Sequence, residues 1–134
     1  MAETRWFCDP ERKTAYAKEL VMADCLFCKM AAGEIPTDPH YDDDLVFVIR
    51  DIHPRAPLHL LIIPKEHIPT AADVMGEHGP VISRMFTAAA QVAKEEKITD
   101  AGYRLAFNVG EAAGMTISHL HMHLLAGRTL GPEG

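Results

Sequence analysis

Cysteine is scarce in this sequence, which contains only Cys8, Cys25 and Cys28. Three cysteines cannot form the disulfide framework that holds small secreted domains together. Two of them form a C-x-x-C motif, and in a cytosolic chain this spacing indicates metal binding or redox chemistry. We expect Cys8, which lies outside the motif, to be a free thiol.

Long apolar runs and clusters of basic residues are also missing. No apolar run approaches the length of about 18 residues that a membrane helix needs, and the first residues lack the apolar core of a signal peptide. The formal charge is −6, from 13 Lys and Arg against 19 Asp and Glu, which argues against binding to nucleic acid. We therefore expect a cytoplasmic protein that binds neither membranes nor nucleic acid.

The pattern of apolar residues predicts one domain in which helices pack on one side of an antiparallel sheet. With 134 residues, 48% of them hydrophobic, the chain can bury a sizeable core. Residues 41–44 are polar and turn-like. Periodicity, capping residues and β-branched content predict helices over 9–23, 26–32 and 80–96, and strands over 45–50, 58–63, 103–108 and 118–125.

The stretch from Ser118 to Leu125 contains the clearest sign of chemistry. His119, His121 and His123 alternate with apolar residues, so an extended chain would place the three imidazoles on one face. Histidine acts as a nucleophile, an acid or a base near neutral pH and is also a common metal ligand. The pattern therefore indicates either a metal cage or a group-transfer site.

The cysteine pair is a second potential metal site. Cys25 and Cys28 have the spacing of half a zinc knuckle and need two further ligands to complete a tetrahedron. His59 is a candidate third ligand if its strand runs beside the histidine-rich strand. Composition alone leaves an equal chance that His59 is an ordinary buried histidine.

These residues resemble the histidine triad superfamily, and in particular its nucleotide-binding phosphoramidase branch, Hint. Residues 119–125 match the signature of three histidines separated by apolar residues. Further matching blocks occur in the right order over residues 24–130. They are Cys25–Met30, Gly33–Pro36, Asp51–Ile52, Ala56–Pro57, His59, Ile63–Ile68, Asn108–Gly110 and Gly127–Arg128.

The resemblance implies a twisted antiparallel sheet of about five strands with a long helix on one face. We expect this histidine triad domain to span 24–134, after an N-terminal helical extension over 1–23. Relatives of this kind form homodimers, and Ala88, Ala89 and Ala90 on more than one side of the long helix are weak support for that assembly here.

The resemblance also implies hydrolysis of the P–N bond in purine nucleoside phosphoramidates through a covalent intermediate. His121 would be the nucleophile, His119 would offer its carbonyl to His121, and His123 would stabilise the phosphate and assist proton delivery. Two alternatives stay open: asymmetric cleavage of dinucleoside polyphosphates, and nucleotide binding with slow catalysis in a scaffold protein.

Positions that match the family's nucleotide contacts can be assigned one by one. Asp51 would accept hydrogen bonds from both ribose hydroxyls. Asn108 and Thr116 match polar contacts to the phosphate, whereas Met115 replaces a residue that is commonly polar. An apolar slot for a purine base, of adenine or guanine, would be lined by Leu26, Phe27, Met30, Ile49 and Ile52.

Many family members with C-x-x-C hold a structural zinc ion. The corresponding ligands here would be Cys25, Cys28, His59 and His119, which would form a closed tetrahedral site without an open position for catalysis. We interpret His40, His53, His67 and His78 as surface or loop histidines. The chain ends at Gly134, whereas relatives often carry a longer tail that reaches the partner's site, so the preference for leaving groups is open.

Overall fold

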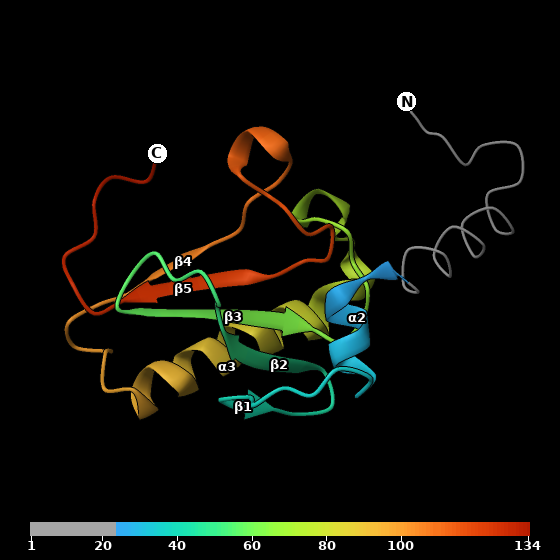
Figure 1. Ribbon diagram of the computed structural model, residues 1–134, viewed down its shortest axis with the longest axis horizontal. Coiled ribbons are helices and arrows are strands. Elements are labelled where there is room, and N and C mark those ends of the chain that lie inside the picture. Colours follow the sequence, from blue (N-terminus) through green and yellow to red (C-terminus); the bar gives the residue numbers. More distant parts are fainter. Residues whose placement is uncertain (1–23) are drawn as a thin grey trace, which may run out of the picture.

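The computed structural model describes residues 24–134, which form a five-stranded antiparallel sheet with helices on both faces (Figure 1). The strand order is β1-β2-β3-β5-β4. The elements are α2 (Leu26–Ala31), β1 (Tyr41–Asp42), β2 (Val46–Arg50), β3 (Leu58–Pro64), η1 (Ala71–Asp73), η2 (Gly76–His78), α3 (Gly79–Glu95), β4 (Arg104–Ala106), η3 (Glu111–Ala113) and β5 (Met122–Ala126).

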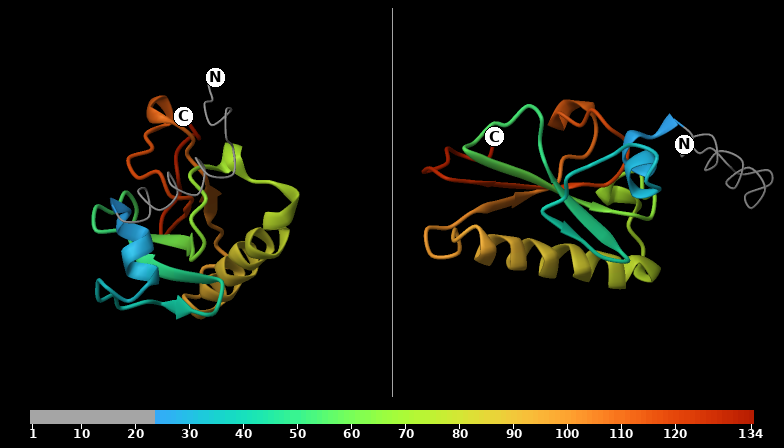
Figure 2. Two further views of the ribbon diagram at one scale, coloured as in Figure 1. Left: turned by 90° about the vertical axis from the view of Figure 1, so that its right-hand side faces the viewer. Right: turned by 60° about the horizontal axis from the view of Figure 1, so that its bottom comes forward.

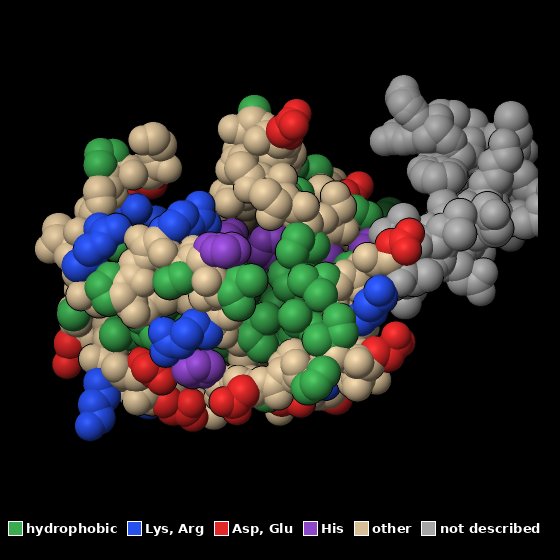
Figure 3. All heavy atoms as spheres, in the orientation of Figure 1, with side chains coloured by type: hydrophobic (Ala, Val, Ile, Leu, Met, Phe, Trp, Pro, Cys, Tyr) green, Lys and Arg blue, Asp and Glu red, His purple; other side chains and the backbone are tan. Residues whose placement is uncertain are grey.

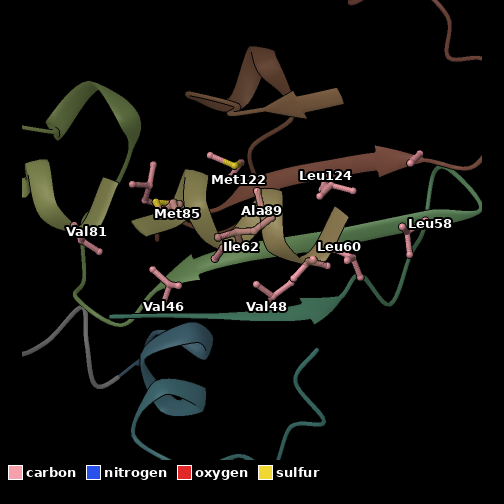
Figure 4. Close-up of a cluster of buried hydrophobic side chains, with 14 of the residues drawn as sticks. Val46, Val48, Leu58, Leu60, Ile62, Val81, Met85, Ala89, Met122 and Leu124 are labelled. Atoms are coloured by element: carbon pink, nitrogen blue, oxygen red, sulfur yellow. The ribbon is translucent and has the colours of Figure 1, made fainter. Parts of the chain in front are cut away.

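Alternation along the three central strands separates the two faces of the sheet. One face packs against the long helix α3, and its buried side chains form the main core (Figures 2 and 4). These side chains include Val46, Val48, Leu60, Ile62, Met122 and Leu124. The residues between them point to the opposite face, which therefore carries the histidines of β3 and β5.

Helix α3 follows the pattern that the sequence predicts. Pro80 stands in its first turn, where the missing N–H costs nothing, and its buried stripe includes Val81, Met85 and Val92. Ala88 and Ala89 are buried against the sheet of their own chain, so they give no support for a dimer contact. The predicted long helix on one face is confirmed.

The short helix α2 covers part of the opposite face, so the prediction that helices pack on one side of the sheet holds only for α3. Cys25 is its N-cap, and the Sγ atom of Cys25 accepts a hydrogen bond from the Cys28 backbone N–H at 3.4 Å. Phe27 is buried against Phe47, Leu61 and other apolar residues of the sheet. This packing fixes both cysteines at the end of the sheet where the histidine-rich segment begins.

The structure confirms most predicted elements and corrects two of them. Tyr41 and Asp42 form a short edge strand that pairs with β2, where the sequence predicts a turn. Strand β5 begins at Met122, so His119 and His121 precede it. The reason is that β3 ends at Pro64, and the Leu120 N–H instead donates to the Ile68 carbonyl at 2.6 Å. The predicted helix over 9–23 lies outside the described residues.

Across residues 24–134, every helix is too short or too polar to span a lipid bilayer.

Candidate active site and metal centre

A cavity of about 450 Å³ lies on the face of the sheet opposite α3. Figure 3 shows histidine side chains on the surface between a patch of apolar side chains and a group of basic ones. The cavity is lined by Leu26, Phe27, Met30, Ile49, Arg50, Asp51, Ile52, His53, Arg55, Leu61, Gly114, Thr116, Ile117, His121 and His123. Its walls thus combine an apolar slot with carboxylate, imidazole and guanidinium groups.

The residues expected to contact a nucleotide come together around this cavity. Seven of the eight line it, although they come from α2, from the last residues of β2 and those just after it, and from the segment before β5. The eighth, Asn108, places its side-chain amide group 3.4 Å from His123 Nε2. Those lining the cavity are Leu26, Phe27, Met30, Ile49, Asp51, Ile52 and Thr116.

His121 presents one ring nitrogen to the cavity and uses the other within the protein. Its Nδ1–H donates to the His119 carbonyl at 2.7 Å, so the lone pair of the neutral ring is on Nε2. The Phe27 ring packs edge-on against the imidazole at a centroid distance of 5.3 Å. This arrangement fixes both the tautomer and the orientation that a nucleophilic nitrogen needs.

His123 is buried beside His121, at a ring centroid distance of 5.1 Å. Burial, with smaller contributions from neighbouring His121, His59 and Arg55, lowers the pKa of His123 from 6.5 to about 4. His123 is therefore a neutral imidazole at pH 7. Its Nδ1 atom lies 2.9 Å from His59 Nε2, so Nε2 carries the proton and can donate a hydrogen bond.

A chain of hydrogen bonds determines this protonation pattern. The Arg55 backbone N–H donates to His59 Nδ1 at 3.0 Å, which makes His59 Nε2 the protonated nitrogen. His59 Nε2 lies 3.4 Å from an Asp51 carboxylate oxygen as well as close to His123. Burial lowers the pKa of His59, although the Asp51 charge opposes this shift. His59 is thus a neutral donor beneath the cavity.

A second cluster, formed by Cys25, Cys28, His67 and His119, lies under α2. The four donor atoms are all within 4.8 Å of one another. The His119 Nδ1 atom lies 3.2 Å from Cys25 Sγ, 3.5 Å from Cys28 Sγ and 3.1 Å from His67 Nδ1. A tetrahedral zinc ion with its usual bond lengths separates its ligands by about 3.4–3.8 Å, so the cluster is close to the required size.

The chemistry of the cluster also fits a metal ion. The Nε2–H of His119 donates to the Pro64 carbonyl at 2.8 Å, which leaves the lone pair on Nδ1, among the sulfur atoms. Burial lowers the pKa of His119 to about 4, although the bond to Pro64 opposes the shift, so the ring is neutral. Two thiolates and two neutral imidazoles would form a closed, neutral zinc site.

Comparison with known proteins identifies the family. Residues 24–132 match the family described as "Scavenger mRNA decapping enzyme C-term binding". The chain is 50% identical over 109 residues to a purine nucleoside phosphoramidase of Escherichia coli K12, a match that covers 81% of this chain and 92% of that protein. It is also similar to a HIT family hydrolase from Legionella pneumophila, with a TM-score of 0.80 and 44% identity over 83% of this chain and all of the other. This chain belongs to the histidine triad superfamily.

A crystallised histidine triad protein from Clostridium difficile is similar as well. It has a TM-score of 0.78 and 37% identity, and the match covers 83% of this chain and 96% of that one. The three rings that give the superfamily its name have separate surroundings in the present structure. His119 is in the cysteine cluster, whereas His121 and His123 line the cavity.

The structure corrects one member of the predicted zinc site of this histidine triad protein. The antiparallel register pairs His59 with Leu125, which is six residues beyond His119. His59 is therefore too far along the sheet to reach the cysteines that His119 contacts. His67 occupies that place, with its Nδ1 atom 3.2 Å from Cys28 Sγ. The interpretation of His67 as a surface histidine is wrong, because the residue is buried.

The sequence patterns do not identify several of the residues that line the cavity. Leu61 is two positions beyond His59 on the same face of β3, so strict alternation could have identified it. Arg55 and Ile117 carry no such signal, because their positions depend on how the loops fold over the sheet, and Arg50 is the last residue of β2. Arg55 is the most consequential of them, since it brings a positive charge next to His123.

Proposed function

We propose that this protein hydrolyses purine nucleoside 5′-phosphoramidates, releasing an amine and a nucleoside monophosphate. The observation that carries the proposal is the hydrogen bond from His121 Nδ1–H to the His119 carbonyl, which leaves Nε2 available to attack phosphorus at the cavity. The 50% identity to a purine nucleoside phosphoramidase supports the choice of substrate class.

The reaction has two steps. His121 Nε2 attacks phosphorus, the P–N bond breaks, and the departing nitrogen takes up a proton as the amine leaves. Water then attacks the nucleotidyl-histidine, the bond from phosphorus to Nε2 breaks, and a proton is released, so the cycle is balanced. In both steps His123 Nε2–H, a neutral donor, and Asn108 stabilise the negative charge on the phosphoryl oxygens.

The rest of the cavity binds the nucleoside. The base lies in the slot that includes Leu26, Phe27 and Met30, and the Asp51 carboxylate accepts hydrogen bonds from the ribose hydroxyls. Thr116, on the segment before β5, contacts the phosphate. The location of all these groups around one cavity with His121 supports these roles.

The cysteine cluster has a structural role in this proposal. Zinc held by Cys25, Cys28, His67 and His119 would cross-link α2 to the segment after β3 and to the segment before β5. With four protein ligands no position is open to substrate. Since His119 also offers its carbonyl to His121, this cross-link would hold the nucleophile in place.

The chain assembles as a homodimer in the cytoplasm. Strand β4 pairs only with β5 among the described strands, which leaves an edge for a second sheet, and Phe86 on α3 is 48% exposed. Cys25 and Cys28 form no disulfide, which is typical of a reducing compartment and supports the cytoplasm. Sedimentation velocity tests the assembly, because a monomer at micromolar concentration would contradict it.

The activity is tested with two substrates and one variant. Wild-type protein and His121→Ala are incubated with an AMP–amine conjugate and, separately, with a dinucleoside polyphosphate. The proposal expects rapid amine release by wild type that falls at least about a thousandfold in His121→Ala, as removal of a nucleophile does. Preferential cleavage of the polyphosphate, or nucleotide binding without turnover in either case, would contradict it.

A further inference from the structure

Arg55 lies at the wall of the cavity, on a loop whose backbone is held from two sides. Its N–H donates to His59 Nδ1 at 3.0 Å, and its carbonyl accepts a hydrogen bond from the Arg128 guanidinium at 3.0 Å. Pro54 and Pro57 restrict the same loop. The side chain therefore starts from a fixed point next to the catalytic histidines.

The guanidinium group reaches the ring of His123. Arg55 Nη2 lies 3.3 Å from His123 Nδ1, the nitrogen that also accepts from His59. Since a guanidinium has five N–H donors, this one contact leaves others for a bound molecule. Within residues 24–134, no carboxylate lies within 4 Å of Arg55, whereas Arg84 and Arg104 both have acidic partners. The Arg55 guanidinium is thus not paired directly with a carboxylate, although Asp51 lines the same cavity.

The order of the rings shows which end of the substrate this charge would meet. Phe27, at the apolar slot, contacts His121, and His121 contacts His123, whose other neighbours are His59 and Arg55. With a base in the slot and phosphorus at His121, Arg55 is on the side of His123 away from Phe27, where Asp51 also adjoins His59.

We propose that Arg55 determines specificity by favouring substrates whose leaving group carries a negative charge next to the scissile bond, such as a carboxylate. This inference rests on the proposed function and names the class of leaving group for it. A guanidinium binds a carboxylate or phosphate through paired N–H donors, which a neutral amine leaving group cannot use. Because Arg55 is exposed, the effect is that of a solvent-screened ion pair.

Two matched substrates test the inference. One is AMP joined through nitrogen to glycine, and the other is AMP joined to glycinamide, so that they differ only in a carboxylate against a carboxamide. Wild type and Arg55→Gln are compared by the ratio of kcat/KM for the two substrates. We expect this ratio to fall about three- to fivefold in Arg55→Gln, the size of an exposed ion pair. The preference of wild type should also weaken at high salt.

Two further variants separate local charge from other effects. Arg55→Lys keeps the charge and should retain part of the preference. Arg104→Gln removes an equal charge from β4, outside the cavity, and should leave the ratio unchanged. A ratio that is the same in wild type and Arg55→Gln overturns the inference. If kcat/KM falls equally for both substrates, the ratio is unchanged and Arg55 acts at the phosphate being transferred.

A binding measurement tests the role of Arg55 without relying on catalysis, so failure of this inference can be told apart from failure of the proposed function. If wild type releases neither amine faster than His121→Ala, the proposed function fails. Calorimetric titration with AMP and ADP then tests Arg55 directly, because ADP adds negative charge beyond the first phosphate. A weaker affinity of Arg55→Gln for ADP alone supports the inference, and unchanged affinity for both overturns it.

Discussion

His59 Nε2 lies 2.9 Å from His123 Nδ1, and both rings are buried, with His123 at the wall of the cavity and His59 behind it. The hydrogen bond assigns the proton of His123 to Nε2, on the side where a phosphoryl group would lie. Neither residue could serve in this way as an imidazolium, because each ring must both donate and accept. The neutral state of the pair therefore underlies the site's chemistry.

This neutrality predicts a pH dependence of stability. The pKa of His123 is about 4 in the folded protein and about 6.5 in the unfolded chain, so the unfolded chain binds more protons between these values. The free energy of unfolding should therefore fall as the pH is lowered from 6.5 to 4, and His123 should contribute at most about 3 kcal/mol of that fall. In His123→Gln this contribution is absent. Urea titrations of both proteins across this range check it, and equal pH slopes would contradict it.

Metal analysis tests the corrected zinc site. Purified wild type should contain about one zinc per chain, and Cys28→Ser or His67→Ala should lose most of it and unfold at a lower temperature. His59→Asn is the matched control, because it removes a buried histidine outside the cluster and should retain zinc. Zinc retained in His67→Ala but lost in His59→Asn would restore the ligand set predicted from sequence.

Asp51 should act through the ribose. Replacement by Asn removes the charge that strengthens hydrogen bonds from the ribose hydroxyls, and kcat/KM should fall about 10- to 100-fold. Because Asp51 also lies 3.4 Å from His59, a substrate without these hydroxyls provides the control. The 2′,3′-dideoxy analogue should be nearly insensitive to Asp51→Asn, whereas an equal loss would assign Asp51 to the histidines.

Asp43 should be important for stability at the turn into β2. Partial burial raises its pKa, but hydrogen bonds from Tyr41, two backbone N–H groups and Arg84 outweigh burial and hold the pKa well below its usual range. We expect Asp43→Ala to cost about 2–4 kcal/mol of unfolding free energy at pH 7. Because the folded pKa is depressed, this contribution should persist above about pH 4 and disappear as the pH falls further.

The neighbouring Asp44 provides the control for this turn. Its carboxylate also contacts Arg84, at 3.1 Å, but its side chain is 81% exposed. Asp44→Ala should change stability by no more than about 1 kcal/mol. Chemical denaturation of the two variants compares them, and similar costs would show that Asp43 acts only as one of several surface charges.

Local patterns in the sequence were sufficient for most of the fold. The alternation in β2 and β3 and the helical stripe of α3 reflect side-chain directions that depend only on neighbouring residues. The choice of His67 over His59 as neighbour of the cysteines depends on the register between β3 and β5, which no local pattern determines. The position of Arg55 depends on loop contacts with His59 and Arg128, which are equally non-local.

The most direct test of the mechanism is the intact mass of the protein after brief mixing with an AMP–amine conjugate. Wild type should gain the mass of one nucleotidyl group, and peptide mapping should place it on His121. His121→Ala should show no such species. Turnover without an adduct at His121, or an adduct on another residue that persists in His121→Ala, would contradict the proposed covalent mechanism.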